Sequence, residues 1–109
     1  MILYRPVGQR ELDLIAASGW REFPPRLPHQ PVFYPVCNVE YAILIARDWN
    51  ARDEGSGHVV RFEIEENFIA RYERKIVGAR IHEEYWIPAE DLEDLNANLR
   101  GLIESVVSF

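Results

Sequence analysis

The stretch Ile81-His82-Glu83-Glu84-Tyr85-Trp86-Ile87-Pro88 decides how the rest of this chain is interpreted. It alternates as a half-buried strand does, with one face formed by Ile81, Glu83, Tyr85 and Ile87 and the other by His82, Glu84 and Trp86. Pro88 has no amide hydrogen to donate to a ladder, so we expect the strand to end there. The next residues, 89–91, place two acidic side chains where the first turn of a helix favours them.

Polar side chains on the second face of this strand are candidates for a functional site. Glu84 and His82 share that face with the ring of Trp86, near the start of the strand. A carboxylate at such a position is well placed for chemistry, and we expect it to be partly solvated. The alternative is a polar edge-strand face that Trp86 covers.

Composition and charge limit the classes of protein to which the chain can belong. Its 109 residues suit one domain, spanning 1–109, and its net charge of −6 argues against nucleic acid or an anionic membrane as the main partner. No apolar run approaches the roughly 20 residues that span a bilayer, and the N-terminus lacks the features of a signal peptide. We therefore expect a cytoplasmic protein. The single cysteine and three dispersed histidines predict no metal site.

The remaining secondary structure follows from local patterns. Strands are predicted at Ile2–Arg5, where Pro6 interrupts the run, and at Val32–Tyr34, His58–Ile64, Lys75–Val77 and Leu102–Phe109. Helices are predicted at Gln9–Ser18 with Gly19 as a cap, at Val39–Trp49 after Asn38, within Glu65–Tyr72, and from residue 89 to Gly101 through Leu92, Leu95 and Leu99. About six short strands and four short helices in mixed order predict a single α+β domain with a bent, mostly antiparallel sheet.

Two segments are predicted to lack regular structure. Five of the seven prolines lie in residues 24–35, and their fixed φ angles exclude a helix and favour a stiff, ordered loop wrapped over the domain. Residues 50–57, which end in Asp53-Glu54-Gly55-Ser56-Gly57, form the second predicted loop.

The order of these motifs resembles the ADP-ribosyltransferase fold that bacterial toxins share with the poly-ADP-ribose polymerases. The motifs are a first strand ending in Tyr4-Arg5, an aromatic strand with Phe33-Tyr34, an Ala-rich helix containing Glu40-Tyr41-Ala42, and a carboxylate before an apolar strand, Glu84-Tyr85-Trp86. The chain is also similar along its length to short bacterial proteins labelled ADP-ribosylation/crystallin-type. The resemblance implies an ADP-ribosyltransferase-like fold.

The resemblance also implies which residues form the site. In the family an Arg or His on the first strand holds NAD, a Ser or Tyr lies on an inner strand, and a Glu begins a late strand; the matching positions are Arg5, Tyr34 and Glu84. His82 occupies the place two residues before the catalytic Glu, where one branch of the family has an acceptor-selecting Gln or Glu. Neither the Ser-Thr-Ser run of that branch nor the His-Gly pair of the polymerase branch is present.

The chemistry expected of such a site is ADP-ribosyl transfer from NAD, or NAD cleavage. A carboxylate bound to the ribose 2′-hydroxyl stabilises an oxocarbenium-like state, which is the role assigned to Glu84. Arg5 would orient the phosphates or ribose, Tyr34 would stack on nicotinamide, and His82 would contact NAD or act as an acid or base. The acceptor is not specified by the sequence.

Other interpretations of the same residues remain open. Arg5 can instead pair with a surface acid, and Tyr34 can belong to the core. A non-catalytic relative would bind a nucleotide or a protein partner, as an antitoxin or immunity-type protein does. A structural interaction domain would dock a partner through exposed Trp20 and Trp86.

Overall fold

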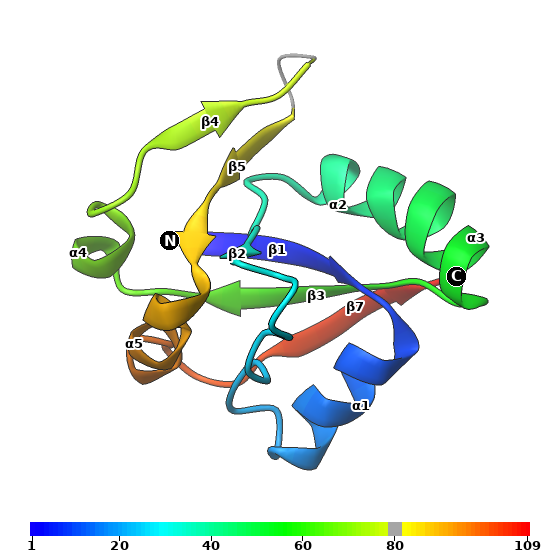
Figure 1. Ribbon diagram of the computed structural model, residues 1–109, viewed down its shortest axis with the longest axis horizontal. Helices are drawn as coiled ribbons and strands as arrows, with labels where there is room; N and C mark the ends of the chain where they lie inside the picture. Colours follow the sequence, from blue (N-terminus) through cyan, green and yellow to red (C-terminus); the bar gives the residue numbers. More distant parts are fainter. Residues whose placement is uncertain (79–81) are drawn as a thin grey trace.

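Three antiparallel strands form the centre of the computed structural model, which describes residues 1–78 and 82–109. Strands β1 (Ile2–Val7), β3 (His58–Glu63) and β7 (Glu104–Ser108) lie in the order β1-β3-β7, and short helices surround them (Figure 1). Two further antiparallel pairs join β2 (Val32–Phe33) to β6 (Ile87–Pro88), and β4 (Arg74–Ile76) to β5 (Glu83–Tyr85). The chain is therefore one small α+β domain with antiparallel sheets, as the sequence predicts.

Strand β1 is longer than the predicted Ile2–Arg5, because Pro6 lies within it, opposite Val59 of β3. Only one side of β1 is fully paired; on the other side Tyr4 forms an isolated bridge with Val36. A proline is tolerated in such a position because its missing amide hydrogen leaves no central ladder bond unmade. The prediction that Pro6 interrupts the strand was wrong.

The stretch around Glu84 is divided into two ladders instead of forming one continuous strand. β5 pairs with β4, Trp86 lies between the ladders, and β6 ends at Pro88, as the sequence predicts. The predicted alternation is confirmed in the described part: Tyr85 is buried in the main core, while the indole of Trp86 reaches the carboxylate of Glu84. Ile81, predicted on the Tyr85 face, lies outside the described residues.

Residues 35–37 lie between β1 and β5 and hydrogen-bond to both, so they hold Arg5 of β1 and Glu84 of β5 in one part of the molecule. Tyr4 and Val36 exchange two backbone hydrogen bonds of 2.8 and 2.9 Å. The same segment also bonds to β5. The carbonyl of Pro35 accepts a hydrogen bond from the Tyr85 amide, and the Cys37 amide donates one to the carbonyl of Glu83. The aromatic Phe33-Tyr34 segment leads directly into this connection.

The first helix and the proline-rich segment agree with their predictions. α1 (Gln9–Ala17) is followed by Gly19 at a φ of 77°, a left-handed conformation that glycine adopts without strain. Residues 21–31 contain no helix or strand. Phe23 anchors them in the core, and the side-chain amide of Asn96 accepts from its N–H at 2.9 Å and donates to its carbonyl at 3.0 Å.

The second helical region extends beyond the predicted Val39–Trp49. α2 (Val39–Ile45) continues without a break through the π-helical turn η1 (Ala46–Asn50) into α3 (Ala51–Glu54). The helix ends at Gly55, whose φ is 84°, so most of the predicted loop at residues 50–57 is helical. The polar composition of this segment was misleading, because the residues before Gly55 remain helical and the left-handed glycine marks the stop.

The C-terminal half also differs in its boundaries. α4 (Glu66–Ile69) is a single turn within the predicted segment. The turn η2 (Ala89–Asp91) and α5 (Leu92–Ala97) replace the longer helix expected to reach Gly101. Leu99 forms an isolated β-bridge with Ile64 instead of a third helical contact, so its spacing from Leu95 was misleading.

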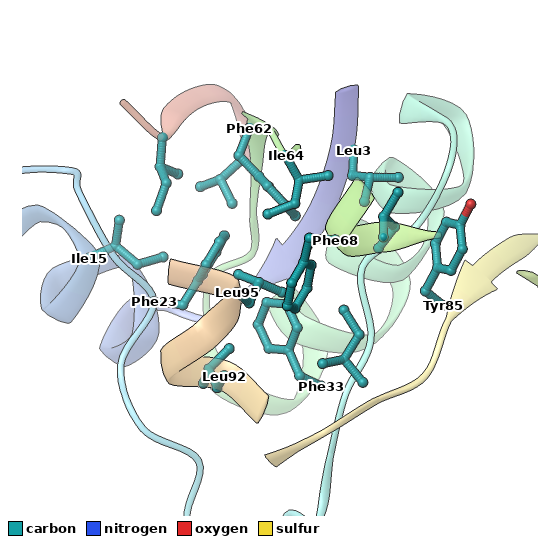
Figure 2. Close-up of a cluster of buried hydrophobic side chains, with 14 of the residues drawn as sticks. Leu3, Ile15, Phe23, Phe33, Phe62, Ile64, Phe68, Tyr85, Leu92 and Leu95 are labelled. Atoms are coloured by element: carbon teal, nitrogen blue, oxygen red, sulfur yellow. The ribbon is translucent and has the colours of Figure 1, made fainter. Parts of the chain in front are cut away.

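The core consists of two clusters of buried side chains. In the main cluster (Figure 2) Phe23 makes edge-to-face contacts with Phe33 and Phe62, at centroid distances of 5.0 and 4.9 Å. Trp20 packs against this cluster and is half-buried, so it is not the exposed docking residue that was proposed. A second, smaller cluster contains Val36, Tyr41, Ala42, Ala46 and Val59. Tyr41 thus belongs both to this cluster and to the site described next.

Candidate functional site

One pocket brings together three of the residues that the sequence placed in a site. It has a volume of about 350 Å³, and we call it the Glu84 pocket. Arg5, Tyr34 and Glu84 all contribute to its lining, although they are far apart in the sequence. The other lining residues are Pro6, Arg26, Val36, Tyr41, Ile45 and Asn50. The expectation that Arg5, Tyr34 and Glu84 share one cleft is confirmed; their roles remain predictions.

The Glu84 carboxylate is buried and held by neutral donors. The residue is only 7% exposed, in contrast to the expected partly solvated position. Oε1 accepts a hydrogen bond from the Tyr41 hydroxyl at 2.8 Å, and Oε2 accepts one from Nε1 of Trp86 at 2.9 Å. Among the described residues, no Arg, Lys or His side chain forms an ion pair with it. Hydrogen bonds from neutral donors offset only part of the free-energy cost of burying a negative charge.

Tyr41 is held in place from both its backbone and its ring. Asn38 caps α2 by accepting a hydrogen bond from the Tyr41 amide at 2.8 Å, which fixes the first turn of the helix. The ring of His82 stacks on the ring of Tyr41 at a centroid distance of 4.4 Å. Burial, the hydrogen bond to Glu84 and the negative charge of Glu84 raise the pKa of Tyr41 to about 12. Tyr41 therefore remains a neutral donor at physiological pH.

Arg5, which also lines the pocket, is paired with Glu11. Its Nε and Nη2 donate to the two carboxylate oxygens of Glu11 at 2.6 and 2.9 Å, in the bidentate geometry that suits a guanidinium. Nη1 donates to the backbone carbonyl of Tyr34 at 3.4 Å, and the guanidinium lies 4.3 Å from the ring centroid of Phe33. The surface ion pair considered from the sequence is thus a buried one.

Two aromatic rings stand at the rim of the pocket. Tyr34 and Trp86 are 41% and 46% exposed and meet edge to face at 6.0 Å. Tyr34 is therefore available to a ligand and does not belong to the core. Trp86 acts both as a cover and as a hydrogen-bond donor to Glu84.

His82 and Glu83 have different surroundings from those of Glu84. His82 does not belong to the lining of the Glu84 pocket but contacts Tyr41, so any effect it has on the site passes through that ring. Glu83 pairs with Arg74 at 3.1 Å on the opposite face of the strand, as the alternation predicts. Neighbouring glutamates on one short strand thus differ in burial and in charge compensation.

Three residues that contribute to this site were not predicted from the sequence. Tyr41 was noted only as part of a family motif, and no local pattern connects it with a carboxylate 43 positions away. Glu11 and Arg26 likewise meet Arg5 only through the fold. The hydrogen bond from the Trp86 indole to Glu84 was predictable from the sequence, because residues two apart on a strand share a face.

No group of three or more His, Cys, Asp or Glu side chains suited to a metal ion is found within residues 1–78 and 82–109. Within the same residues, none of the helices has both the length and the apolarity needed to cross a bilayer. Comparison of the chain with protein-family models, curated proteins and solved structures found no match.

Proposed function

We propose that the Glu84 pocket binds NAD or a related nucleotide and that Glu84 promotes cleavage of the bond between nicotinamide and ribose. The ADP-ribose unit then passes either to water or to an acceptor. The observation that carries this proposal is the state of Glu84, a buried carboxylate with neutral hydrogen-bond donors at the wall of a pocket. Its negative charge is not neutralised by any described cation and is free to act on a ligand.

The hydrogen bonds of Glu84 leave room for a substrate hydroxyl. Each carboxylate oxygen has two lone pairs, and Tyr41 and Trp86 each occupy one of them. A ribose 2′-hydroxyl can therefore donate to Glu84 while both protein donors stay in place. Since these donors fix the carboxylate before the substrate arrives, little reorganisation is needed during the reaction.

The reaction moves positive charge from the nicotinamide ring to the ribose. The bond from the nicotinamide nitrogen to C1′ breaks, its electron pair leaves with the neutral nicotinamide, and positive charge develops on C1′ and the ring oxygen. The Glu84 carboxylate, bound to the 2′-hydroxyl, stabilises that charge, as carboxylates do in glycoside hydrolysis. Water or an acceptor nucleophile then forms a bond to C1′ and loses a proton.

The remaining residues bind and orient the ligand in this proposal. Tyr34 offers an exposed ring on which nicotinamide can stack, and Arg5 contributes positive charge to the wall that faces the phosphates. His82 supports the ring of Tyr41 and through it the position of Glu84. The docking-domain alternative is less favoured, because Arg5 and Glu84 line one pocket and Trp20 packs against the core.

A second candidate is a non-catalytic module that binds a nucleotide or a protein partner. The observation that favours it is the pairing of Arg5 with Glu11, since a guanidinium whose fork is already filled is a poor ligand for phosphate. Such a module would bind NAD or ADP-ribose without releasing nicotinamide.

The experiment that separates these functions is a nicotinamide-release assay on the parent, Glu84→Gln and the matched control Glu83→Gln. Gln keeps the size of Glu84 but not its charge, so turnover is expected to fall about 10²–10⁴-fold. Glu83→Gln is expected to retain parental turnover, because Glu83 points to the opposite face and pairs with Arg74.

Two results would change the conclusion. Equal turnover by the parent and Glu84→Gln would remove Glu84 from the mechanism. Binding of NAD by the parent, measured by calorimetry, without nicotinamide release across a range of acceptors would favour the non-catalytic module.

A further inference from the structure

The guanidinium of Arg26 lies where several cavities meet. Arg26 lines the Glu84 pocket and also a neighbouring pocket of about 400 Å³ beside the start of α1, which we call the α1 pocket. The two pockets share Arg5, Pro6, Arg26 and Asn50, so they adjoin along this wall. The α1 pocket continues over Gly8, Arg10, Leu14, Leu27 and Gln30. A ligand that extends from Glu84 into the α1 pocket passes the two buried arginines.

The two arginines differ in how many of their donors are in use. Arg5 directs three nitrogens to Glu11 and to the Tyr34 carbonyl. Arg26 has an ion pair with Glu11 at 3.7 Å, which is too long for a hydrogen bond, and its guanidinium lies 6.0 Å from the ring centroid of Phe33. Its Nε is buried, and no hydrogen-bond partner for it exists among the described residues. Arg26 therefore has hydrogen-bond donors that are not in use, whereas those of Arg5 are occupied by Glu11 and Tyr34.

The charges at this wall also favour an added anion. Two guanidinium groups share the single carboxylate of Glu11, and the side chains of Arg5 and Arg26 are only 8% and 12% exposed. Burial, and after it the charge of Arg5, lowers the pKa of Arg26. An anion placed against Arg26 would balance the second positive charge and satisfy its unused donors.

We propose that Arg26, and not Arg5, binds a phosphoryl group of the ligand where the Glu84 pocket meets the α1 pocket. Arg5 is a positioning residue that fixes Glu11 and the wall beside Arg26. The phosphoryl group suits this place because it offers several acceptor oxygens with negative charge, and an arginine fork binds it bidentately. The inference rests on the proposed function for the rest of the ligand, a nucleotide, but its test does not require turnover.

The test is calorimetric titration of the parent, Arg26→Gln and Arg26→Lys with pyrophosphate, ADP and nicotinamide riboside. Arg26→Gln is expected to weaken binding of pyrophosphate and ADP about 10- to 100-fold, the range for a hydrogen bond to a charged group. Nicotinamide riboside has no phosphate, so its affinity is expected to stay unchanged. Tighter binding of ADP than of pyrophosphate identifies a nucleotide as the source of the phosphoryl group, and equal binding identifies the free anion.

Arg71→Gln is the matched control. It removes the same charge from an arginine that also lies over a phenylalanine, Phe68, at 4.9 Å, but outside both pockets. Parental affinity for pyrophosphate is expected for this variant. If Arg26→Gln fails to fold by circular dichroism, Arg26→Lys decides the matter, because it keeps the charge but loses the fork and is expected to bind several-fold more weakly.

The inference is overturned if the folded Arg26 variants bind pyrophosphate and ADP like the parent, or if the parent binds neither. Its failure is distinct from failure of the proposed function. If Arg26→Gln loses pyrophosphate binding while the parent never releases nicotinamide, the phosphoryl site is supported and the enzymatic function is rejected. If turnover depends on Glu84 but substitution of Arg26 changes neither turnover nor binding, the enzymatic function is supported and the phosphoryl site is rejected.

Discussion

Two carboxylates in adjoining pockets, Glu11 in the α1 pocket and Glu84 in the Glu84 pocket, have different partners. Glu11 is 19% exposed and lies between the cations of Arg5 and Arg26. Glu84 is more deeply buried, yet its partners are the uncharged Tyr41 and Trp86. The charge of Glu11 is therefore balanced within the folded protein, whereas that of Glu84 forms no ion pair among the described residues. Burial alone therefore does not distinguish the two carboxylates; the charge of their partners does.

The largest effect expected from this comparison is the loss of stability in Glu11→Gln. The substitution leaves two buried guanidinium groups without a carboxylate, and removing one partner of such a pair is strongly destabilising. We expect the free energy of unfolding to fall by about 3 kcal/mol, measured by urea denaturation.

Glu65→Gln is the control for that prediction. Glu65 pairs with Arg100 at the surface at 3.5 Å, where each side chain is about half exposed. Exposed pairs contribute roughly 0–1 kcal/mol, so this variant is expected to unfold almost like the parent. A loss no greater in Glu11→Gln than in Glu65→Gln would mean that Glu11 does not hold the arginine wall.

Local patterns were enough to predict the elements of this fold but not how they end or meet. The strand at His58–Glu63 and the helix at Gln9–Ala17 have strong periodicity and were predicted within a residue of their observed bounds. Pro6 was misjudged because the cost of a proline depends on whether a neighbouring strand occupies its amide side, which is a tertiary property. The helix through Asn50 was cut short for a different, local reason: composition suggested a loop at residues 50–57, but the helix continues to Gly55.

The candidate site divides in the same way. The alternation of β5 predicted that Glu83 and Glu84 point to opposite faces, and the position of Glu84 beside Trp86 followed from it. The burial of Glu84 did not follow, because Tyr41 arrives from a helix 43 residues earlier in the chain. Glu11 pairs with Arg5 only because the chain reverses between β1 and α1. Contacts between different elements, such as these two, are set by the fold and leave no periodic pattern in the sequence.

A smaller effect of opposite sign is expected for the stability of Glu84→Gln. Gln can accept from the Trp86 indole through its oxygen and donate to the Tyr41 hydroxyl through its nitrogen, while the buried charge is removed. Because an unpaired buried charge is costly, we expect the free energy of unfolding to rise by about 1 kcal/mol. Urea denaturation beside Glu83→Gln, which loses only a surface pair with Arg74, provides the comparison. A marked loss of stability in Glu84→Gln would show that its charge, like that of Glu11, is structural.

The smallest effect is a shift in the titration of one tyrosine, and it reports directly on the charge of Glu84. The pKa of Tyr41 in the folded protein, about 12, lies above the ordinary tyrosine value of about 10. The stability contributed by this neutral phenol is complete below pH 10 and is lost as the pH rises through 12, because the unfolded chain gives up the proton first. The pKa of Tyr72 is also raised to about 12, by burial and by the hydrogen bond that its hydroxyl donates to Asp91 at 2.7 Å. The two tyrosines therefore titrate in the same range.

Tyrosinate absorbance against pH, followed in the parent, Tyr41→Phe, Tyr72→Phe and Glu84→Gln, separates these contributions. Each Phe variant is expected to lose one tyrosine from the group that titrates latest. In Glu84→Gln the pKa of Tyr41 is expected to fall below about 12 but to stay above the ordinary value, because burial, the largest cause of the shift, remains. Circular dichroism at each pH restricts the comparison to folded protein. An unchanged titration of Tyr41 in Glu84→Gln would mean that the carboxylate carries no charge next to the phenol, and the contrast with Glu11 would then lose its basis.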